Sequence, residues 1–272
     1  MESWAPCAKG QKQMKKRLGT LFVGVCALAL TVGLSSSASA QSEVKEKPAM
    51  YSYVGNWAIP RAQWGEMEKA NAADQKILDK ALASGTIVAW GNDVNLIHSA
   101  NGETHDDWWS AMSMAGLLNV LEQFYAAGTT TSPVLASATK HWDNMYVSHY
   151  YNWHAGSWKN LYTHVGVYKL KANAPDDAVE TLSKSLIVPL LEKLLADGTI
   201  HEYEVDTEAI HTESPGTFMI VYICPNGEAL DKVNAAVQSA IKADPLAGSA
   251  FGSMTESDGH RDGLFRTAAT YK

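Results

Sequence analysis

An internal repeat constrains what this chain can fold into more than any other feature of its sequence. The segment Lys80–Ile87 reappears as Lys193–Ile200, and the pair Ile97-His98 reappears at the same spacing as Ile210-His211. Weaker matches lie on either side of these, between Tyr51–Trp57 and Tyr162–Tyr168 and between His141–Asp143 and His260–Asp262. A period of about 110 residues is the size of a small domain, which predicts a tandem duplication rather than a solenoid.

Both copies show the same order of predicted elements: strand, long helix, strand, strand, helix, strand. In the first copy the strands cover Tyr51–Ile59, Thr86–His98, His105–Met112 and Trp142–Tyr151, and the helices cover Ala62–Ala83 and Leu117–Ala127. In the second copy the strands cover Tyr162–Leu170, Thr199–His211, Thr217–Cys224 and His260–Lys272, and the helices begin after Asn173–Asp177 and at Asn226-Gly227. The first of these helices should kink at Pro189, because proline lacks a backbone donor, and should end at Gly198.

The order βαββαβ is the split βαβ, or ferredoxin-like, motif. Two such sheets can close into an eight-stranded assembly that leaves no long unpaired edge. Together with the Gly-Thr-Ile turn that begins at Gly85 and at Gly198, this arrangement resembles the dimeric α+β barrel superfamily in a single-chain form. The resemblance implies an α+β fold in which two tandem ferredoxin-like βαββαβ units form a dimeric-α+β-barrel-like assembly. Members include cofactor-free monooxygenases, haem-binding chlorite dismutases and dye-decolourising peroxidases, and small isomerases; no motif here selects one of them.

The first forty residues have the pattern of an export signal. Lys15–Arg17 supply positive charge, Leu18–Leu34 are mainly apolar, and Ser37–Ala40 provide a small-residue cleavage site before Gln41. The apolar stretch is short for a membrane span. We therefore predict a periplasmic or secreted protein, cleaved near Ala40-Gln41, that keeps no stable membrane anchor.

The internal repeat and the predicted export signal, or leader, together divide the chain into five parts. The predicted parts are a signal peptide over residues 1–40, with translation starting at Met1 or Met14, a linker over 41–49, a first ferredoxin-like unit over 50–152, a linker over 153–160 and a second unit over 161–272. The leader carries five cationic residues and one acidic residue, so cleavage changes the net charge from −7 to −11. This acidity argues against nucleic acid and against an anionic membrane surface as partners.

Cys224 is the only cysteine that remains after cleavage, which excludes an internal disulfide. It ends the apolar run Phe218–Cys224, so we expect a buried small hydrophobe rather than a reactive thiol.

Histidines that recur in both copies are expected to serve the fold. His98 and His211 are equivalent, and so are His141 and His260. His105 should lie across a hairpin from His98, followed by two aspartates. Two imidazoles with nearby carboxylates can hold a divalent metal, so His98 and His105 are the candidate metal ligands, with ordinary surface histidines as the alternative.

Three residues without an identical partner in the other copy are the candidate catalytic residues: His149, His164 and Tyr53. His164 begins the second copy, where its counterpart in the first is Tyr53. The first and last strands of a ferredoxin-like sheet are neighbours, so Tyr53 should lie near His149 and approach His164 across the closed assembly. The three can then line one cavity, with a histidine as general base or haem ligand and Tyr53 as hydrogen-bond donor.

Aromatic residues near these positions indicate a ligand pocket. All eight tryptophans beyond the leader fall in the first unit or the linker that follows it. The candidate ligand-binding residues are Trp57, Tyr151, Trp153, His154 and Tyr168. The alternative is that these aromatic residues fill a larger core in the first unit.

These features predict an exported protein that binds a small molecule. One hypothesis is an enzyme of the monooxygenase or haem type that acts on a small aromatic or apolar compound. The alternative is a non-catalytic periplasmic binding or accessory protein, and a scaffold without a small-molecule site is the third hypothesis. Any haem would be bound non-covalently, because the sequence has no Cys-x-x-Cys-His attachment motif. A protein without a cofactor and a homodimer are both compatible with this interpretation.

Overall fold

The structure, a computed structural model, describes residues 44–99, 102–212 and 214–272. The predicted export signal and its cleavage site lie outside the described residues. Eight antiparallel strands close into a barrel: β1 (Met50–Trp57), β2 (Ala89–Asn95), β3 (His105–Ala111), β4 (His141–Trp153), β5 (Gly156–Lys169), β6 (Glu202–Ile210), β7 (Thr217–Cys224) and β8 (Arg261–Tyr271).

The strands follow one another around the barrel in the order β1-β3-β2-β8-β5-β7-β6-β4, and β4 pairs with β1 to close it. The first four strands of the chain form one half of the barrel, and the last four form the other half in the same relative order. The halves join where β2 pairs with β8 and where β4 pairs with β6. Each of these strands therefore has two neighbours, so the barrel presents no free strand edge to a partner chain.

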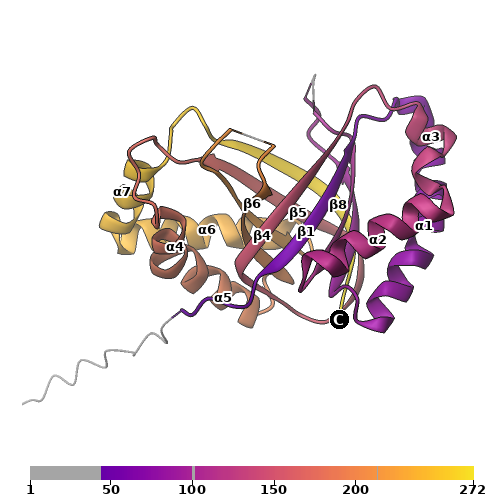
Figure 1. The fold of residues 1–272 in the computed structure, drawn as a ribbon. Coiled ribbons are helices and arrows are strands. Elements are labelled where there is room, and N and C mark those ends of the chain that lie inside the picture. Colours follow the sequence, from indigo (N-terminus) through magenta and orange to yellow (C-terminus); the bar gives the residue numbers. More distant parts are fainter. Residues whose placement is uncertain (1–43, 100–101, 213) are drawn as a thin grey trace, which may run out of the picture. The chain divides into compact units, whose positions relative to one another are not determined.

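Helices cover the outer face of each half of the barrel (Figure 1). Over the first half lie the 3₁₀ turn η1 (Arg61–Gln63), α1 (Trp64–Ser84), α2 (Met114–Ala127), the 3₁₀ turn η2 (Thr129–Thr131) and α3 (Pro133–Ala136). Over the second half lie α4 (Ala178–Leu182), the π-helical η3 (Ser183–Ile187), α5 (Val188–Ala196), α6 (Gly227–Ala243) and α7 (Pro245–Met254). Among the helices of the described chain, none has both the length and the apolar character needed to cross a membrane.

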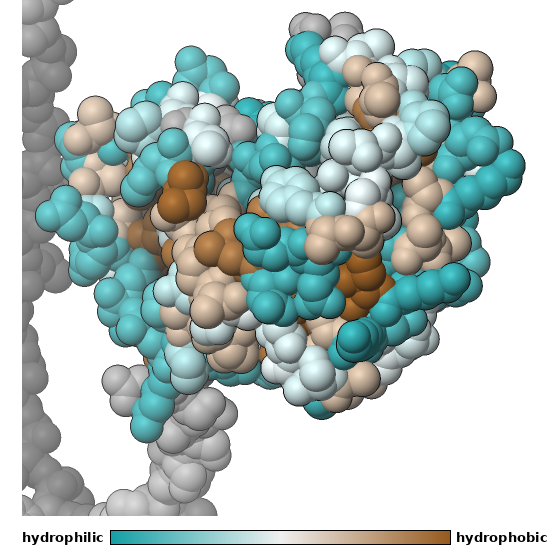
Figure 2. Space-filling view, turned by 45° about the vertical axis from the view of Figure 1, so that its right-hand side comes forward, coloured by the Kyte–Doolittle hydropathy of each residue, from teal (hydrophilic) through white to brown (hydrophobic). Residues whose placement is uncertain are grey.

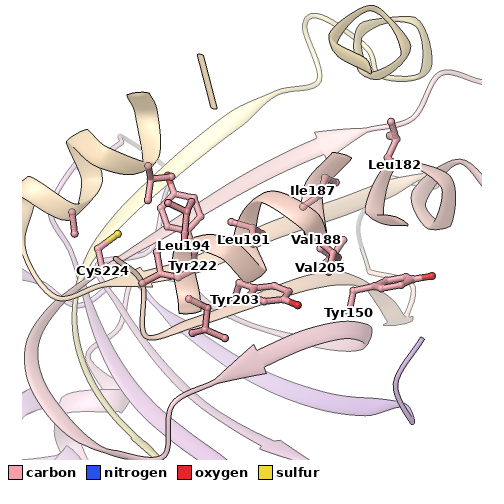
Figure 3. Close-up of a cluster of buried hydrophobic side chains, with 14 of the residues drawn as sticks. Tyr150, Leu182, Ile187, Val188, Leu191, Leu194, Tyr203, Val205, Tyr222 and Cys224 are labelled. Carbon is pink, nitrogen blue, oxygen red and sulfur yellow. The ribbon is translucent and has the colours of Figure 1, made fainter. Parts of the chain in front are cut away.

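The two largest apolar clusters of the described chain lie between the helices and the barrel. Beneath α5 and α6, side chains such as Leu191, Leu194 and Val233 pack against the outer faces of β6 and β7 (Figure 3). Beneath α1 and α2, a second cluster contains Leu78 and Leu117. Cys224 belongs to the first cluster and is fully buried, which confirms the expected apolar role, and burial raises the pKa of its thiol to about 12.

The predicted strands and long helices agree with the structure to within three residues, except that β5 begins at Gly156, six residues before the predicted Tyr162 and inside the predicted linker over 153–160. Two features of the second half were also not predicted. The helix predicted to kink at Pro189 is irregular just before that residue: the turn widens into the π-helical η3, which relieves the clash between a proline ring and the carbonyl four residues earlier. The helix α7 has no counterpart in the prediction. It begins where Asp244 Oδ1 accepts hydrogen bonds from the backbone N–H groups of Leu246 and Ala247, at 3.1 Å each.

The surface drawn in Figure 2 is mixed in character. Hydrophobic residues appear on this face as patches separated by hydrophilic side chains. The largest exposed fractions among hydrophobic residues belong to Leu246 on α7, at 81%, and to Ile97 after β2, at 66%. The more informative feature for function is the interior of the barrel.

Candidate functional site

The interior of the barrel holds a cavity of about 530 Å³. All eight strands contribute lining side chains, because alternate residues of a strand point to the same face. On β1, Ser52, Val54 and Asn56 point inward, whereas Tyr51 and Tyr53 point outward into the cluster beneath α1 and α2. The volume lies within the range of known small-molecule sites.

Five buried carboxyl groups line this cavity. Asp93 on β2 is paired with Asp106 on the adjacent β3, while Glu202, Glu204 and Asp206 alternate along β6. In the closed order of eight strands, β6 is four strands away from β2 in either direction. The two groups of acids therefore stand on opposite walls of the barrel. Each of the five residues is at most 7% exposed.

The packing of β6 against α5 fixes the inward direction of its acids. Tyr203 and Val205, which alternate with the acids, point outward into the apolar cluster beneath that helix (Figure 3). Because side chains alternate, a shift of one residue in register would place both apolar groups in the polar cavity and all three carboxyls in the apolar cluster. The apolar face of β6 thus holds its acidic face inside the barrel.

Burial raises the pKa of each of these carboxyl groups. The pKa of Asp93 rises to about 7, and the pKa values of Asp106, Glu202, Glu204 and Asp206 rise well above their usual range. Repulsion between neighbouring carboxyls adds to the effect of burial, since Glu204 lies within hydrogen-bonding reach of both Glu202 and Asp206. The raised pKa values favour the protonated forms of these acids, and neighbouring carboxyls such as Glu202 and Glu204 can share a proton.

Few donors reach these acids. Trp108 Nε1 donates a hydrogen bond to Asp93 Oδ2 over 3.1 Å, and Ser52 Oγ lies 3.5 Å from Glu204 Oε2. The hydrogen bond from Trp108 fixes the orientation of its indole in the interior. It also favours the ionised form of Asp93 and so partly offsets the effect of burial on the pKa of that carboxyl. The distance from Ser52 is at the limit for a hydrogen bond, so that contact is weak. Thr267 also lies within hydrogen-bonding reach of Asp93, and Ser148 of Asp206.

Several other carboxyl oxygens in the cavity are without a conventional donor among the described residues. Within the described part of the chain, no hydroxyl, amide or cationic group hydrogen-bonds either oxygen of Glu202 or Oδ1 of Asp106. Among the described lining residues, the one basic side chain is that of Arg261, which is exposed at the start of β8. Buried polar atoms in proteins are nearly always hydrogen-bonded, so this cavity has unused capacity to accept hydrogen bonds.

The two ends of the barrel differ. At the end nearest the C-terminus, the buried ring of Tyr271 lies 5.9 Å from Trp108, 5.9 Å from Trp153 and 6.2 Å from Trp158, centroid to centroid. These rings close that end with apolar surface. At the other end the cavity is lined by exposed residues, including Ile97 and Arg261, so a ligand would enter there.

The predicted catalytic residues all point away from this cavity. Tyr53 is buried outside the barrel wall, where its ring stacks on Trp109 at 4.4 Å. His149 is exposed, with Nδ1 3.1 Å from the Lys47 carbonyl oxygen. His164 stacks on Tyr222 at 4.8 Å, also on the outer face. The structure does not bring the three into one cavity, because each occupies an outward position of its strand; their catalytic role stays a prediction.

The predicted ligand-binding residues also lie outside the barrel lining. Trp57 stacks on His141 at 3.5 Å, and Tyr168 stacks on His260 at 4.4 Å. Tyr151 and Trp153 stack on each other at 5.5 Å beside the closed end, while His154 Nε2 lies 3.1 Å from the Leu195 carbonyl oxygen. These contacts give each ring a structural partner, which supports the alternative that the aromatic residues fill a core.

Two imidazoles meet at Asp262 beside the open end. Its Oδ1 lies 3.0 Å from His260 Nε2 and 3.3 Å from His164 Nε2. Asp143 has a similar position in the first half, 3.4 Å from His141 Nε2 and within hydrogen-bonding reach of Tyr53. Burial lowers the pKa of His164, although Asp262 opposes this shift, so His164 is a neutral base near pH 7.

The predicted metal ligands are near each other but lack carboxylate partners. His98 and His105 both contact the indole of Trp64, with ring centroids at 5.4 and 5.1 Å. Asp106 points into the barrel instead, and Asp107 Oδ1 accepts a hydrogen bond from Asn92 Nδ2 over 2.6 Å. In the described segments, no group of three or more histidine, cysteine, aspartate or glutamate side chains is arranged to hold a metal ion.

His105 should be neutral throughout the physiological range. Its burial, together with the nearby His98, lowers the pKa of its imidazole to about 4. At His141, burial also favours the neutral form, but hydrogen bonds to Asp143 and the Asn56 carbonyl outweigh it and raise the pKa. In an NMR titration from about pH 5 to 8, we expect the ring signals of His141 to shift and those of His105 to stay constant. A midpoint near pH 6.5 for His105 would contradict this burial argument.

No family model matches the sequence, and neither does any curated protein. Among solved structures, the chain is similar to the putative monooxygenases of Lactobacillus acidophilus NCFM (12% identity, TM-score 0.60) and Fusobacterium nucleatum (7%, 0.62) and to an anthrone oxidase-like protein (9%, 0.51). These matches cover 82%, 83% and 83% of this chain and 96%, 95% and 94% of those chains. The chain therefore shares the α+β barrel fold of these structures, as expected from the resemblance drawn from the sequence. Identities this low establish the fold alone.

The interior of this α+β barrel does not fit haem. A haem site needs an axial side-chain ligand and apolar walls, and haem itself carries two propionate groups. Among the described residues that line the cavity, there is no histidine or cysteine, and five carboxyls would face the propionates. Outside the barrel, His164 directs Nε2 toward Asp262 and stacks on Tyr222, so that nitrogen already has a partner.

Proposed function

We propose that this protein binds a small organic molecule inside its barrel, and that the buried carboxyl groups hold the hydrogen-bond-donating part of that molecule. The observation that carries the proposal is Glu202, which is 1% exposed, lines the cavity and receives no conventional hydrogen bond at either oxygen among the described residues. Of the groups that the structure describes, only the carboxyl of Glu204 lies within hydrogen-bonding reach of it. Leaving its remaining acceptor capacity unused is costly, and a ligand with N–H or O–H donors would remove the cost. The ligand is therefore polar, unlike the aromatic or apolar compound that the sequence suggested.

A large side chain introduced into the cavity tests whether the ligand binds there. Val221 on β7 lines the cavity. We expect a thermal-shift panel of small amines, amides and phenols to contain a compound that raises the Tm of the wild-type protein by several degrees, and we expect Val221→Trp to abolish this response. Leu246→Trp, at an exposed position on α7, should leave the response unchanged. A panel that stabilises nothing, or a Val221→Trp protein that still responds, would overturn the proposal.

An enzymatic role is the second candidate, and the pair of imidazoles at Asp262 favours it. Asp262 lies at the open end of the cavity and contacts both His164 and His260, which supplies a neutral base near the entrance. Incubating the protein with any stabilising compound and following the mass of that compound separates the hypotheses. A gain of one oxygen atom indicates a monooxygenase, whereas recovery of the compound with the same mass and the same chromatographic retention indicates a binding or accessory protein.

We also propose that the barrel arose as two tandem ferredoxin-like units. Gly85 after α1 and Gly198 after α5 have φ angles of 77° and 75°, in the left-handed region that favours glycine. The N–H of Thr86 donates to the Ala81 carbonyl and the N–H of Thr199 to the Leu194 carbonyl, at 2.9 Å each. The same turn thus follows the corresponding helix in each half, in support of the repeat seen in the sequence.

Export is part of the same proposal and rests on the leader. The charged start, apolar stretch and small-residue site before Gln41 support cleavage there and release into the periplasm or the medium. N-terminal sequencing of the protein recovered from a cell fractionation tests this. A chain that begins at Met1 or Met14 and stays in the cytoplasm would contradict export without affecting the cavity.

A further inference from the structure

The placement of the acids in the barrel bears on the chemical class of the ligand. Asp93 and Asp106 stand on one wall, and Glu202, Glu204 and Asp206 stand on the wall opposite. Between the two groups the lining is largely apolar, with Val165, Val221 and Phe265 among its members. A molecule that satisfies this surface has donors at two ends and an apolar middle.

We infer that the ligand is a small linear diamine, with one ammonium group against each acidic wall and its methylene chain along the apolar lining. This inference rests on the proposed binding function and gives it a chemical class. An ammonium group carries three donors and no acceptor, which matches carboxyl oxygens that lack donors. An eight-stranded barrel is wide enough for one small ligand, so a single chain could reach both walls.

Other classes of ligand match this cavity less well. An anion brings acceptors to a lining that already lacks donors, and any of the five acids that is ionised would repel it, with Arg261 as the one basic side chain among the described lining residues. A metal ion needs several ligands that converge on one point, and within the described residues no such group of three exists. An uncharged aromatic compound would fill the apolar middle but would leave Glu202 with no hydrogen-bonding partner among the described residues beyond the carboxyl of Glu204.

Binding of a dication should displace protons from the cavity. The groups that face the ligand are Asp93, Asp106, Glu202, Glu204 and Asp206, with Glu103, Arg261 and Asp262 near the open end and Tyr146 and Tyr271 in the lining. With the cavity empty, burial raises the pKa values of the five acids and favours their protonated forms. A bound ammonium favours the ionised acid, so affinity should rise from about pH 6 to 8 with proton release.

Isothermal titration calorimetry of the full chain with 1,4-diaminobutane, butylamine and 1,4-butanediol at pH 8 tests the inference. We expect the diamine to bind at least about tenfold more tightly than the monoamine, since hydrogen bonds to charged groups are the stronger kind, and we expect the diol not to bind. Repeating the titration in buffers of different ionisation enthalpy should show protons released by the diamine.

Neutral replacements of the acids supply the controls. Glu202→Gln and Asp93→Asn keep the size of the side chain and should each weaken diamine binding about tenfold or more. Glu228→Gln, at an exposed site on α6, should not change it. Equal binding of diamine and diol, or unchanged binding in Glu202→Gln, would overturn the diamine inference. If the diamine fails while a phenol or amide of the thermal-shift panel binds and Val221→Trp abolishes that binding, the diamine inference is wrong and the proposed function stands.

Discussion

The Asp93→Asn protein should be more stable than the wild type at pH 8, by up to roughly 4 kcal/mol, and the difference should shrink as the pH falls toward 4. The reason is that burial raises the pKa of Asp93 from 3.8 to about 7. Each unit of pKa shift is worth about 1.4 kcal/mol, and the shift is roughly three units. Asparagine has nearly the same shape and can still accept the hydrogen bond from Trp108 Nε1.

The sign follows from where the proton is held. Below pH 3.8 Asp93 is protonated in both the folded and the unfolded chain, and its contribution to stability is fully present. Between pH 3.8 and about 7 the unfolded chain loses the proton while the folded chain keeps it, so the wild type loses stability as the pH rises. Above about pH 7 both forms are ionised and the loss is complete.

Urea unfolding at several pH values between about 4 and 8 measures this effect as a free energy of unfolding. Asp231→Asn is the matched control, because Asp231 is exposed on α6, and its unfolding free energy should follow that of the wild type at every pH. If Asp93→Asn also follows the wild type, Asp93 does not hold its proton in the folded barrel, and the electrostatic account of the cavity is wrong.

The repeating pattern of the sequence predicted most of the fold, because each strand and helix is determined mainly by residues that are close together in the sequence. Alternating apolar residues located the strands, and Gly85 and Gly198 located the ends of two helices. The π-helical stretch before Pro189 and the helix after Asp244 were not predicted. The π-helical stretch depends on how a helix that is packed against the barrel relieves the clash with the proline ring. The helix α7 comes from a short segment whose apolar residues show little helical periodicity.

The candidate site was predicted less well, because both faces of a barrel strand can be buried: one face lines the interior, and the other lies beneath the helices. Tyr53, His149 and His164 occupy outward positions, where enclosure comes from helices and loops rather than from the barrel. Adjacent residues in the sequence, such as Ser52 before Tyr53 and Thr163 before His164, line the interior instead. Alternation shows that neighbours in a strand face opposite ways, but it does not show which face becomes the inside of a barrel.

Three acids of the cavity form a recognisable pattern in the sequence, but this pattern alone does not predict that they are buried. Glu202, Glu204 and Asp206 are spaced by two, with Tyr203 and Val205 between them, which is the usual pattern of a strand with one face in water. Only the pairing of β6 with β4 and β7, and closure through strands far along the chain, turns that face inward. Burial of the acids is therefore a property of the tertiary fold.

Gly91→Ala should destabilise the protein by about 2 to 4 kcal/mol and weaken ligand binding. Gly91 faces the interior on β2, and a Cβ atom there would lie 2.4 Å from Cζ2 and 2.5 Å from Cε2 of Trp108. The indole must move, which strains the packed interior and breaks its hydrogen bond to the buried Asp93. Overpacking typically costs 1 to 3 kcal/mol, and loss of a hydrogen bond to a charged group costs a similar amount.

A glycine-to-alanine substitution at another position should raise the stability of the protein instead of lowering it. Gly65 lies in the first turn of α1 with no atom within 4 Å of its Cβ position, so Gly65→Ala should stabilise the helix by up to about 1 kcal/mol. Urea unfolding measures both variants, and tryptophan fluorescence reports the displacement of Trp108. A second change, Trp108→Leu, removes the ring that the new methyl group meets, so the double variant should lose less stability than the sum of the two single variants. Additive losses would show that Gly91 matters for the backbone of β2 and not for the position of Trp108.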